Sequence, residues 1–334
     1  MELSAAASSF GRWRPGKHLS VIGMLKNLQI LRLVRSHIKE LPQEIEELSS
    51  LKLLDLSWCK LEKIPRNVLS SLTALEELYF GHESEVEKDV FLEITSLPHL
   101  TALTARVNFA GSLPTVSFRK PLRRYAIYSE GTWDREYWSR NVALDVVDCS
   151  EMASLQQLFP QVEFLYIKRL RGTWENLFPG CSEDPLLKID ACDVDCLVDT
   201  TRTCHVRPTP LFSNLQCLVL ADMSEMTRLC NSPSPPGWLP NLIEAEIGHY
   251  HGSQNIVPHI IPIGSNVQVL RVQDCLRLKH IFEFDPQHLR HITNEMSLLP
   301  SPTQLILEDL HELTAIWKWP HRTVRIEPLE NLLS

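Results

Sequence analysis

The segment that comes closest to a chemical motif lies near the N-terminus, at Gly11–His18. It reads GRWRPGKH and resembles G-x-x-x-x-G-K-S/T, a loop whose backbone amides cradle phosphates while its lysine reaches the terminal phosphate. That chemistry needs a preceding strand, a helix that opens at the lysine, and a hydroxyl that binds Mg²⁺. Here AAASSF precedes the loop, Pro15 stiffens it, and His18 replaces the hydroxyl residue. We therefore predict a disordered leader over residues 1–19 rather than a nucleotide site.

A second group of residues could in principle hold zinc. Cys192, Cys196, Cys204 and His205 are spaced as C-x₃-C followed by an adjacent C-H pair. Structural zinc sites instead use paired knuckles with regular spacing. The sequence also lacks a nucleophile elbow, an H-E-x-x-H motif and a Gly-rich cofactor loop. We predict that the chain is not an enzyme and binds neither a cofactor nor a metal.

The strongest regularity in the sequence is the spacing of its leucines. An L-x-x-L-x-L pattern recurs every 23 to 24 residues: Leu28, Leu31, Leu33; Leu51, Leu54, Leu56; Leu75, Leu78, Phe80. Alternating apolar residues form a short strand with one buried face. Pro42 and Pro65 then prevent a regular helix and set a return turn. One such coil cannot bury its own leucines, but stacked coils can.

The pattern continues with less regularity to the end of the chain, in about a dozen coils. The later strands are predicted at Leu100/Leu103/Ala105, Leu122/Tyr125/Ile127, Leu144/Val146, Val162/Leu165/Ile167, Leu187/Ile189, Leu215/Leu218/Leu220, Leu242/Ala245/Ile247, Val267/Leu270/Val272 and Leu305/Leu307. We predict an α/β fold: a leucine-rich-repeat solenoid, a right-handed horseshoe with a parallel sheet on its concave face and an irregular or short helical convex side. Regular repeats span 20–81, degenerate repeats with long loops 82–210, and irregular C-terminal repeats 211–334.

Four of the nine cysteines fit the repeat. Cys59, Cys149, Cys192 and Cys275 each stand three residues after the last apolar residue of a predicted strand, namely Leu56, Val146, Ile189 and Val272. The repeat places Asn or Cys there, inside the turn beside backbone polar groups. We expect these four cysteines to be buried, unpaired and inert, because burial in apolar surroundings suppresses the thiolate.

The overall composition narrows the class of partner and the compartment. A net charge of −8 and a pI near 5.9 argue against nucleic-acid binding, which usually requires a basic domain. The N-terminus has no apolar signal core, and no stretch is long and apolar enough to span a membrane. The cysteines lack paired spacing and the chain has no N-glycosylation sequon. We predict a cytoplasmic protein with no nucleic-acid or membrane partner.

What remains for function is the outward face of the strands. The x residues of L-x-x-L-x-L point away from the core and line the concave side. Exposed Trp, Tyr and Arg side chains are the types that anchor protein interfaces. The candidate partner-binding residues are Arg32, Arg35, Asp55, Trp58, Tyr79, His82, Arg106, Tyr166, Lys168 and Arg169.

Residues 20–81 resemble the first repeats of plant coiled-coil-type nucleotide-binding leucine-rich-repeat (NLR) disease-resistance proteins almost throughout, and 212–230 and 305–320 resemble that family's irregular later repeats. The resemblance implies plant defence: recognition of a pathogen effector or of a guarded host protein, and docking of the receptor's nucleotide-binding domain. The sequence contains no such domain, so we expect a fragment of a receptor or a truncated product. The alternative is a repeat adaptor or scaffold, such as a ubiquitin-ligase substrate-recognition arm.

The incomplete loop at Gly11–His18 leads to a direct prediction. Without the hydroxyl and the flanking strand and helix, the chain should not bind ATP or ADP. Isothermal titration calorimetry is the measurement. Micromolar binding that Lys17→Ala abolishes would show that the loop is a working phosphate site after all.

Overall fold

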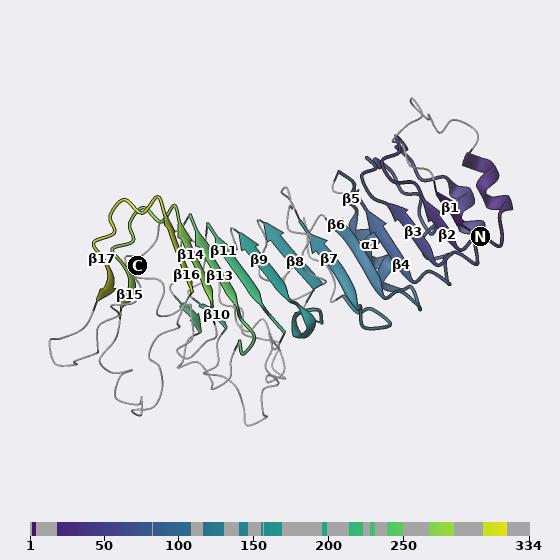
Figure 1. The fold of residues 1–334 in the computed structure, drawn as a ribbon. Coiled ribbons are helices and arrows are strands. Elements are labelled where there is room, and N and C mark those ends of the chain that lie inside the picture. The colour runs from purple at the N-terminus through teal and green to yellow at the C-terminus, as the bar shows by residue number, and fades with distance from the viewer. Residues whose placement is uncertain are drawn as a thin grey trace, which may run out of the picture.

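The structure is a computed structural model that describes residues 2–4, 19–81, 83–107, 116–129, 140–145, 155, 157–168, 196–198, 214–222, 228–230, 239–249, 267–283 and 303–318. Its described strands run side by side along an elongated array, from β1 at the N-terminal end to β16 near the C-terminal end (Figure 1). The strands of the main sheet are β1 (Glu2–Ser4), β2 (Ile30–Arg32), β3 (Leu53–Leu56), β4 (Glu77–Phe80), β5 (Glu85–Val86), β6 (Ala102–Val107), β7 (Arg124–Tyr128), β8 (Arg140–Asp145), β9 (Phe164–Lys168), β11 (Cys217–Ala221), β13 (Glu244–Gly248), β14 (Val269–Gln273) and β16 (Gln304–Glu308).

All 13 strands pair in parallel, and apart from β5 they follow chain order across the sheet. The first strands coincide with the predicted leucine pattern: Leu31, Leu54, Leu78, Leu103 and Tyr125 are cross-strand partners in one row. None of these five side chains is more than 3% exposed. The predicted α/β solenoid, with its strands at 31–33, 54–56 and 78–80 adjacent and parallel, is therefore confirmed.

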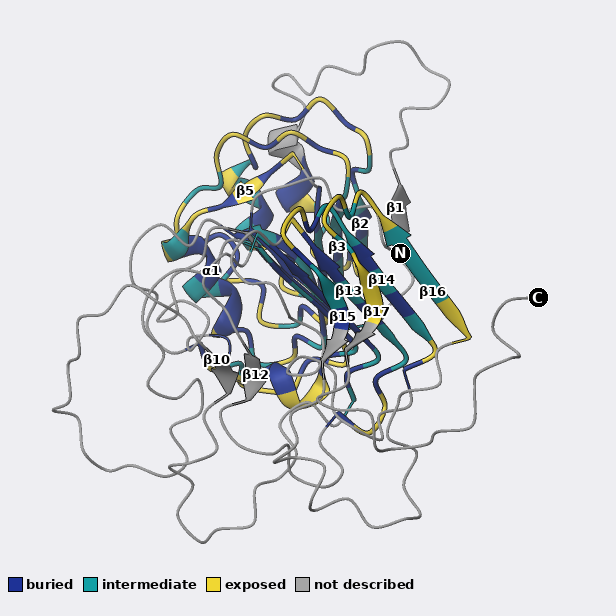
Figure 2. Cartoon of the chain, turned by 90° about the vertical axis from the view of Figure 1, so that its left-hand side faces the viewer, coloured by how far each residue is buried: buried dark blue, intermediate teal, exposed yellow. Residues whose placement is uncertain are grey.

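The return segments are short and mostly irregular. In Figure 2 the strands stack on one side of the array and the helix α1 (Lys88–Thr95) lies on the opposite side. Three short 3₁₀ turns occur at η1 (Leu19–Met24), η2 (Gln43–Glu47) and η3 (Phe159–Gln161). Two small parallel sheets pair β10 (Cys196–Val198) with β12 (Arg228–Cys230), and β15 (His280–Glu283) with β17 (Ala315–Lys318).

The pairing of β8 differs from the predicted pair Leu144 and Val146. Val142 aligns with Leu165, and Leu144 with Ile167, so the inward pair lies two residues earlier. Val142, Leu144 and Val146 alternate with the same period of two, so alternation alone does not distinguish these registers. The spacing that singled out Cys149 depended on Val146. Both residues lie outside the described part of the chain.

A second correction concerns the predicted strand at Leu187 and Ile189. β9 pairs directly with β11 over five residues in full register, so the main sheet has no rung between them. The prediction of a rung there was wrong. Two alternating apolar residues without the leading leucine of the repeat are too weak a signal for a coil. Residues 169–195, which include Cys192, lie outside the described residues.

Tight stacking of the coils is most evident at Gly81, directly after β4. A Cβ atom on Gly81 would lie 2.7 Å from the Trp58 backbone nitrogen and 2.8 Å from the Cys59 carbonyl oxygen. Both neighbours are backbone atoms of the preceding coil, so neither can swing aside. Only glycine allows this approach.

We therefore predict that Gly81→Ala destabilises the protein by about 1–3 kcal/mol, the usual cost of overpacking a well-packed site. The matched control is Gly248→Ala, whose added Cβ would meet the Gln273 side chain at an ordinary 3.4 Å. Urea denaturation of both variants measures the difference. Equal losses of unfolding free energy would contradict a specific clash at Gly81.

Candidate protein-binding face

A sharp left-handed turn follows the inward residues of six repeats. The turn residue stands two positions after the second inward residue and has a φ between 51° and 60°: Arg35, Trp58, Asp222, His249, Asp274 and Asp309. Asp and His tolerate this conformation comparatively well, whereas it is unusual for bulky residues. Arg35 and Trp58 are thus the two atypical members of the set. Strained backbone of this kind concentrates at functional sites.

Arg35 and Trp58 occupy this position in consecutive repeats and contact each other. The Arg35 guanidinium carbon lies 5.6 Å from the centre of the Trp58 ring system. Trp58 is 53% exposed, which is unusual for so large an apolar side chain. A cation–π contact at an exposed site contributes roughly 0.5–1 kcal/mol. The two side chains therefore present one stacked, cationic and aromatic surface, which we call the Arg35–Trp58 stack.

The turn that presents Trp58 is fixed from several directions. The Ser57 amide donates to Asp55 Oδ1 at 3.0 Å, and the Cys59 thiol donates to the Leu33 carbonyl at 2.8 Å. The Ser84 hydroxyl donates to the Cys59 carbonyl at 2.6 Å and accepts from the Leu61 amide at 2.9 Å. Gly81 of the next coil packs against the Trp58 and Cys59 backbone. The backbone around Trp58 is therefore already ordered in the absence of a partner.

Cys59 has the structural role predicted for it. It is buried and free, and its Sγ lies 3.2 Å from the Ser36 hydroxyl. Burial raises the pKa of the Cys59 thiol, and the hydrogen bond from Ser36 offsets only part of that effect. Cys275 is likewise buried and outside any disulfide at the equivalent position, so the predicted burial is confirmed for both, whereas their inertness stays a prediction. Cys217 is also buried and outside any disulfide, but on a strand where the repeat does not predict a cysteine.

A charged network lies beside the stack, on the sheet itself. The Tyr79 hydroxyl donates to Glu77 Oε2 at 2.6 Å and accepts from Arg124 Nη2 at 3.1 Å. Arg124 also pairs with Glu77 at 3.1 Å. Burial and the Glu77 carboxylate raise the pKa of Tyr79, so the hydroxyl stays protonated. Arg124 reaches across Ala102, the small residue that separates it from Glu77 in the sheet register.

The structure divides the predicted site residues into two places. Arg32, Asp55, Tyr79, Arg106, Tyr166 and Lys168 lie on strands, as predicted. Arg35 and Trp58 do not: they lie in the turns after β2 and β3, because their positive φ ends the strand. His82 and Arg169 lie outside the described residues. Sequence reasoning missed Arg124, since its contacts depend on a small neighbour and not on repeat position.

The strand-borne residues make local contacts. Arg32 and Asp55 are neighbours in register, Arg106 lies 3.6 Å from Glu85, and Lys168 lies 3.5 Å from Asp222. Tyr166 packs against an apolar cluster separate from the main core, formed by Phe164, Cys217 and Val219. The three side chains of this cluster are at most 4% exposed, so a partner cannot reach them in this structure. Among the described candidates only Arg35 and Trp58 are exposed and the strand-borne residues are half-buried, so the most accessible pair lies in the first repeats.

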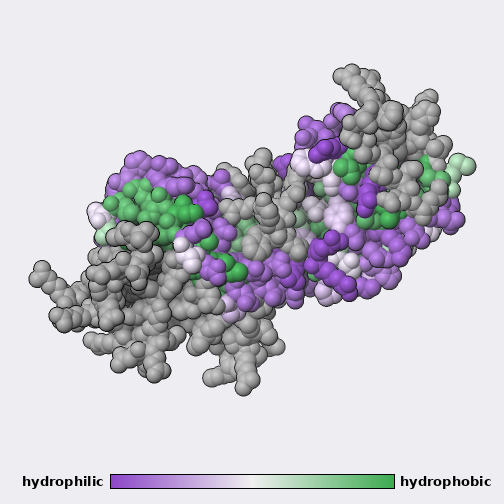
Figure 3. Space-filling model, in the orientation of Figure 1, coloured by the Kyte–Doolittle hydropathy of each residue, from purple (hydrophilic) through white to green (hydrophobic). Residues whose placement is uncertain are grey.

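The surface differs along the array. The broadest hydrophobic patch in Figure 3 lies over the last repeats, where Leu276 and Ile316 are exposed. The inward residues Leu305 and Leu307 of β16 are only half-buried there, because β16 is the last strand of the sheet and packs on one side only. The surface of the first repeats is mainly hydrophilic, so an exposed tryptophan stands out in it.

The described residues contain neither a metal-binding cluster nor a membrane-spanning helix. No group of three or more His, Cys, Asp or Glu side chains among them could hold a metal ion. No helix among them is long and apolar enough to cross a membrane. Of the residues weighed for zinc, Cys192, Cys204 and His205 lie outside the described part of the chain.

Comparison with known proteins agrees with this architecture. Residues 10–190 match the leucine-rich repeat region family. No curated protein matches the chain. An internalin, InlF of Listeria monocytogenes, has a similar fold at 16% identity and a TM-score of 0.44, over 90% of this chain and 83% of its own. InlJ of the same organism is 14% identical with a TM-score of 0.46, and the match covers 86% of this chain and 55% of InlJ. The plant peptide hormone receptor RGFR1, solved in complex with RGF2, is 15% identical with a TM-score of 0.40, and the match covers 90% of this chain and 45% of the receptor chain.

The burial of the turn cysteines predicts their reactivity. Because only the thiolate reacts, Cys59 and Cys275 should be alkylated by iodoacetamide far more slowly in the native protein than in urea. Peptide mass spectrometry after timed labelling is the measurement. If either residue is labelled at similar rates in both states, its turn is not the closed one described here.

Proposed function

Because the chain belongs to the leucine-rich repeat family, whose repeats form protein-interaction domains, we propose that it is the recognition solenoid of a plant intracellular immune receptor. In this role it acts in the cytoplasm in the defence response. It binds a pathogen effector or a guarded host protein, or docks the nucleotide-binding domain of its receptor. The resemblance of residues 20–81 to the first repeats of NLR proteins supports this more specific role.

The observation that carries the proposal is the Arg35–Trp58 stack. Tryptophan and arginine are the residues most enriched among interface hot spots. Here they are exposed, stacked on each other and mounted on turns that are hydrogen-bonded to neighbouring coils. Because the turns are already ordered, binding loses little conformational entropy at this point. An exposed tryptophan with no partner would be a liability, which favours a binding role.

The exposed cation of the Arg35–Trp58 stack favours an acidic group on the partner. Residues 19–80 contain eight basic and eight acidic residues, so this preference is local to the stack and does not extend to the first repeats as a whole. Opposite charge steers encounter and fixes orientation more than it adds affinity. A partner footprint of about 800 Å² would extend from the stack over several neighbouring strands. The Glu77–Tyr79–Arg124 network lies within that reach. Counted from β3, Glu77 and Tyr79 are one strand away and Arg124 is three strands away, at about 4.8 Å per strand.

We predict that Trp58→Ala weakens binding of a matching nucleotide-binding domain by about 30-fold, since a hot-spot residue contributes roughly 2 kcal/mol or more. Arg35→Glu should act in the same direction, because it removes the cation from the ring and reverses the charge. Co-expression pull-down followed by calorimetry on the purified pair gives the affinities.

The matched control is Arg66→Glu. Its side chain is 82% exposed on a return segment, and it only pairs with Asp89 at 3.5 Å. It should change neither binding nor unfolding free energy by more than about 0.5 kcal/mol. Arg32→Glu is a poorer test, since it would place like charges beside Asp55 in the sheet. If Trp58→Ala leaves association intact while changes at Tyr166 and Lys168 abolish it, the contact lies further along the solenoid.

A further inference from the structure

The coil between β7 and β8 is shorter than its neighbours. Leu31, Leu54, Leu78, Leu103 and Tyr125 follow one another at intervals of 22 to 25 residues. Val142, the first inward residue of β8, follows Tyr125 after only 17. The strand register shifts together with the coil length: Val142 pairs with Ile127, the second inward residue of β7, and not with the first, Tyr125. The sheet is continuous here, and residues 130–139 between the two strands lie outside the described part of the chain.

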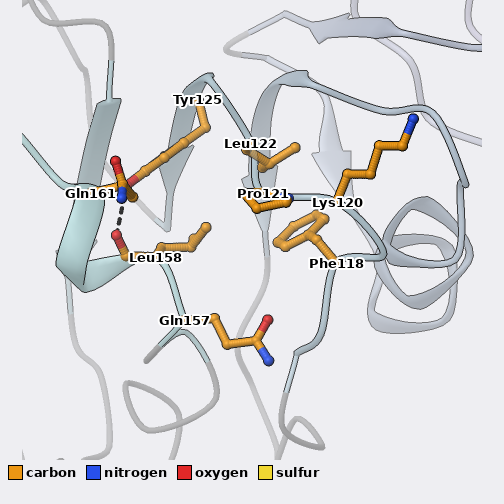
Figure 4. A pocket seen from close by; sticks show the side chains of 8 residues that line it. All are labelled: Phe118, Lys120, Pro121, Leu122, Tyr125, Gln157, Leu158 and Gln161. Atoms are coloured by element: carbon orange, nitrogen blue, oxygen red, sulfur yellow. Dashed lines mark hydrogen bonds between the residues drawn. The ribbon is translucent and has the colours of Figure 1, made fainter.

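An open pocket of about 270 Å³ lies beside this junction, between the segment that leads into β7 and the η3 turn before β9 (Figure 4). Its apolar wall is formed mainly by Phe118, Leu122 and Leu158, whose side chains converge in Figure 4. The amide side chains of Gln157 and Gln161 line the same hollow.

The two walls of the pocket are joined by hydrogen bonds. The Tyr125 hydroxyl donates to the Leu158 carbonyl at 2.8 Å, and Gln157 Nε2 donates to the Ser117 hydroxyl at 3.3 Å. Burial raises the pKa of Tyr125, so its hydroxyl remains a donor. The hollow is thus braced across its width and does not have to form on binding.

Basic residues flank the pocket-lining residues Phe118, Pro121 and Leu122 along the chain. Four of the six residues at 119–124 are basic and exposed: Arg119, Lys120, Arg123 and Arg124. Arg124 pairs with Glu77, but Arg119, Lys120 and Arg123 have no acidic partner among the described residues. The ammonium of Lys120 points away from the pocket in Figure 4, 3.0 Å from His99 Nδ1. Uncompensated positive charge is notable in a chain of net charge −8.

We propose that this basic-rimmed pocket binds an acidic peptide segment of a partner protein, with one aliphatic side chain of that segment seated in the hollow. At about 270 Å³ the pocket lies just below the roughly 300–1,000 Å³ of sites for drug-sized ligands and cofactors, and its apolar wall suits an aliphatic side chain. Arg119, Lys120 and Arg123, which have no acidic partner among the described residues, favour negative charge around it. This site is separate from the Arg35–Trp58 stack.

The test uses the full chain and a fluorescent seven-residue peptide with a central leucine and three Asp or Glu residues on each side. We expect binding by fluorescence anisotropy at low salt that weakens as salt is added. Replacing the central leucine by alanine should weaken binding about 15- to 60-fold, because two to three buried methylene equivalents are lost. The variant Arg119→Glu/Lys120→Glu/Arg123→Glu should lose binding at least tenfold.

Controls separate this site from others and from general charge effects. Lys60→Glu/Arg66→Glu, exposed on earlier coils, and Trp58→Ala should bind the peptide as the unaltered protein does. Equal affinity for the leucine and alanine peptides would overturn the proposal, and so would unchanged binding by the triple variant. Tighter binding of a fluorescent RNA oligonucleotide, or of anionic lipid vesicles, would assign the cations to another class of partner.

Discussion

Each coil of this chain depends on its neighbours to bury its leucines. An inward leucine such as Leu54 is fully buried because it lies between Leu31 and Leu78 in the register of the sheet. Burial of one such side chain is worth roughly 1.5–3 kcal/mol. Leu305, on the last described strand of the sheet, packs on one side and stays half-exposed. Stability is therefore a property of neighbouring pairs of coils, and the spacing between them is tightly constrained.

That spacing also determines the chemistry of the turns. After each strand the chain must bend sharply without leaving buried backbone groups unpaired. In six repeats a left-handed residue makes the bend. Cys59 and Ser84 bond to backbone carbonyls of adjacent coils, and the Ser36 hydroxyl bonds to the Cys59 thiol. Gly81 leaves room for the turn above it. The side chain of the left-handed residue is thereby directed outward, whatever its type, and in two consecutive repeats it is Arg35 and Trp58.

The sequence predicted the strands well where a leucine at each inward position is compatible with only one strand register, as at Leu31, Leu54 and Leu78. It predicted the register poorly where the alternation is ambiguous, as at Val142, Leu144 and Val146. Arg35 and Trp58 were identified as candidates but assigned to strands, because composition carries no information about the sign of φ. Arg124 was missed for another reason. Its contact with Glu77 spans the strand between them and depends on the small size of Ala102 on that strand.

Regular and irregular coils serve recognition differently. Where repeat length is constant, the same turn recurs at the same position in consecutive coils, and neighbouring side chains such as Arg35 and Trp58 stack into a rigid, protruding feature. Where repeat length changes, as between Tyr125 and Val142, the sheet stays continuous with a shifted register, and a hollow lies beside the junction. A protruding aromatic residue inserts into a partner, whereas a hollow accepts a partner's side chain. The variation in coil length thus gives one array two complementary modes of contact, because close packing does not allow a gap to close without a neighbour to fill it.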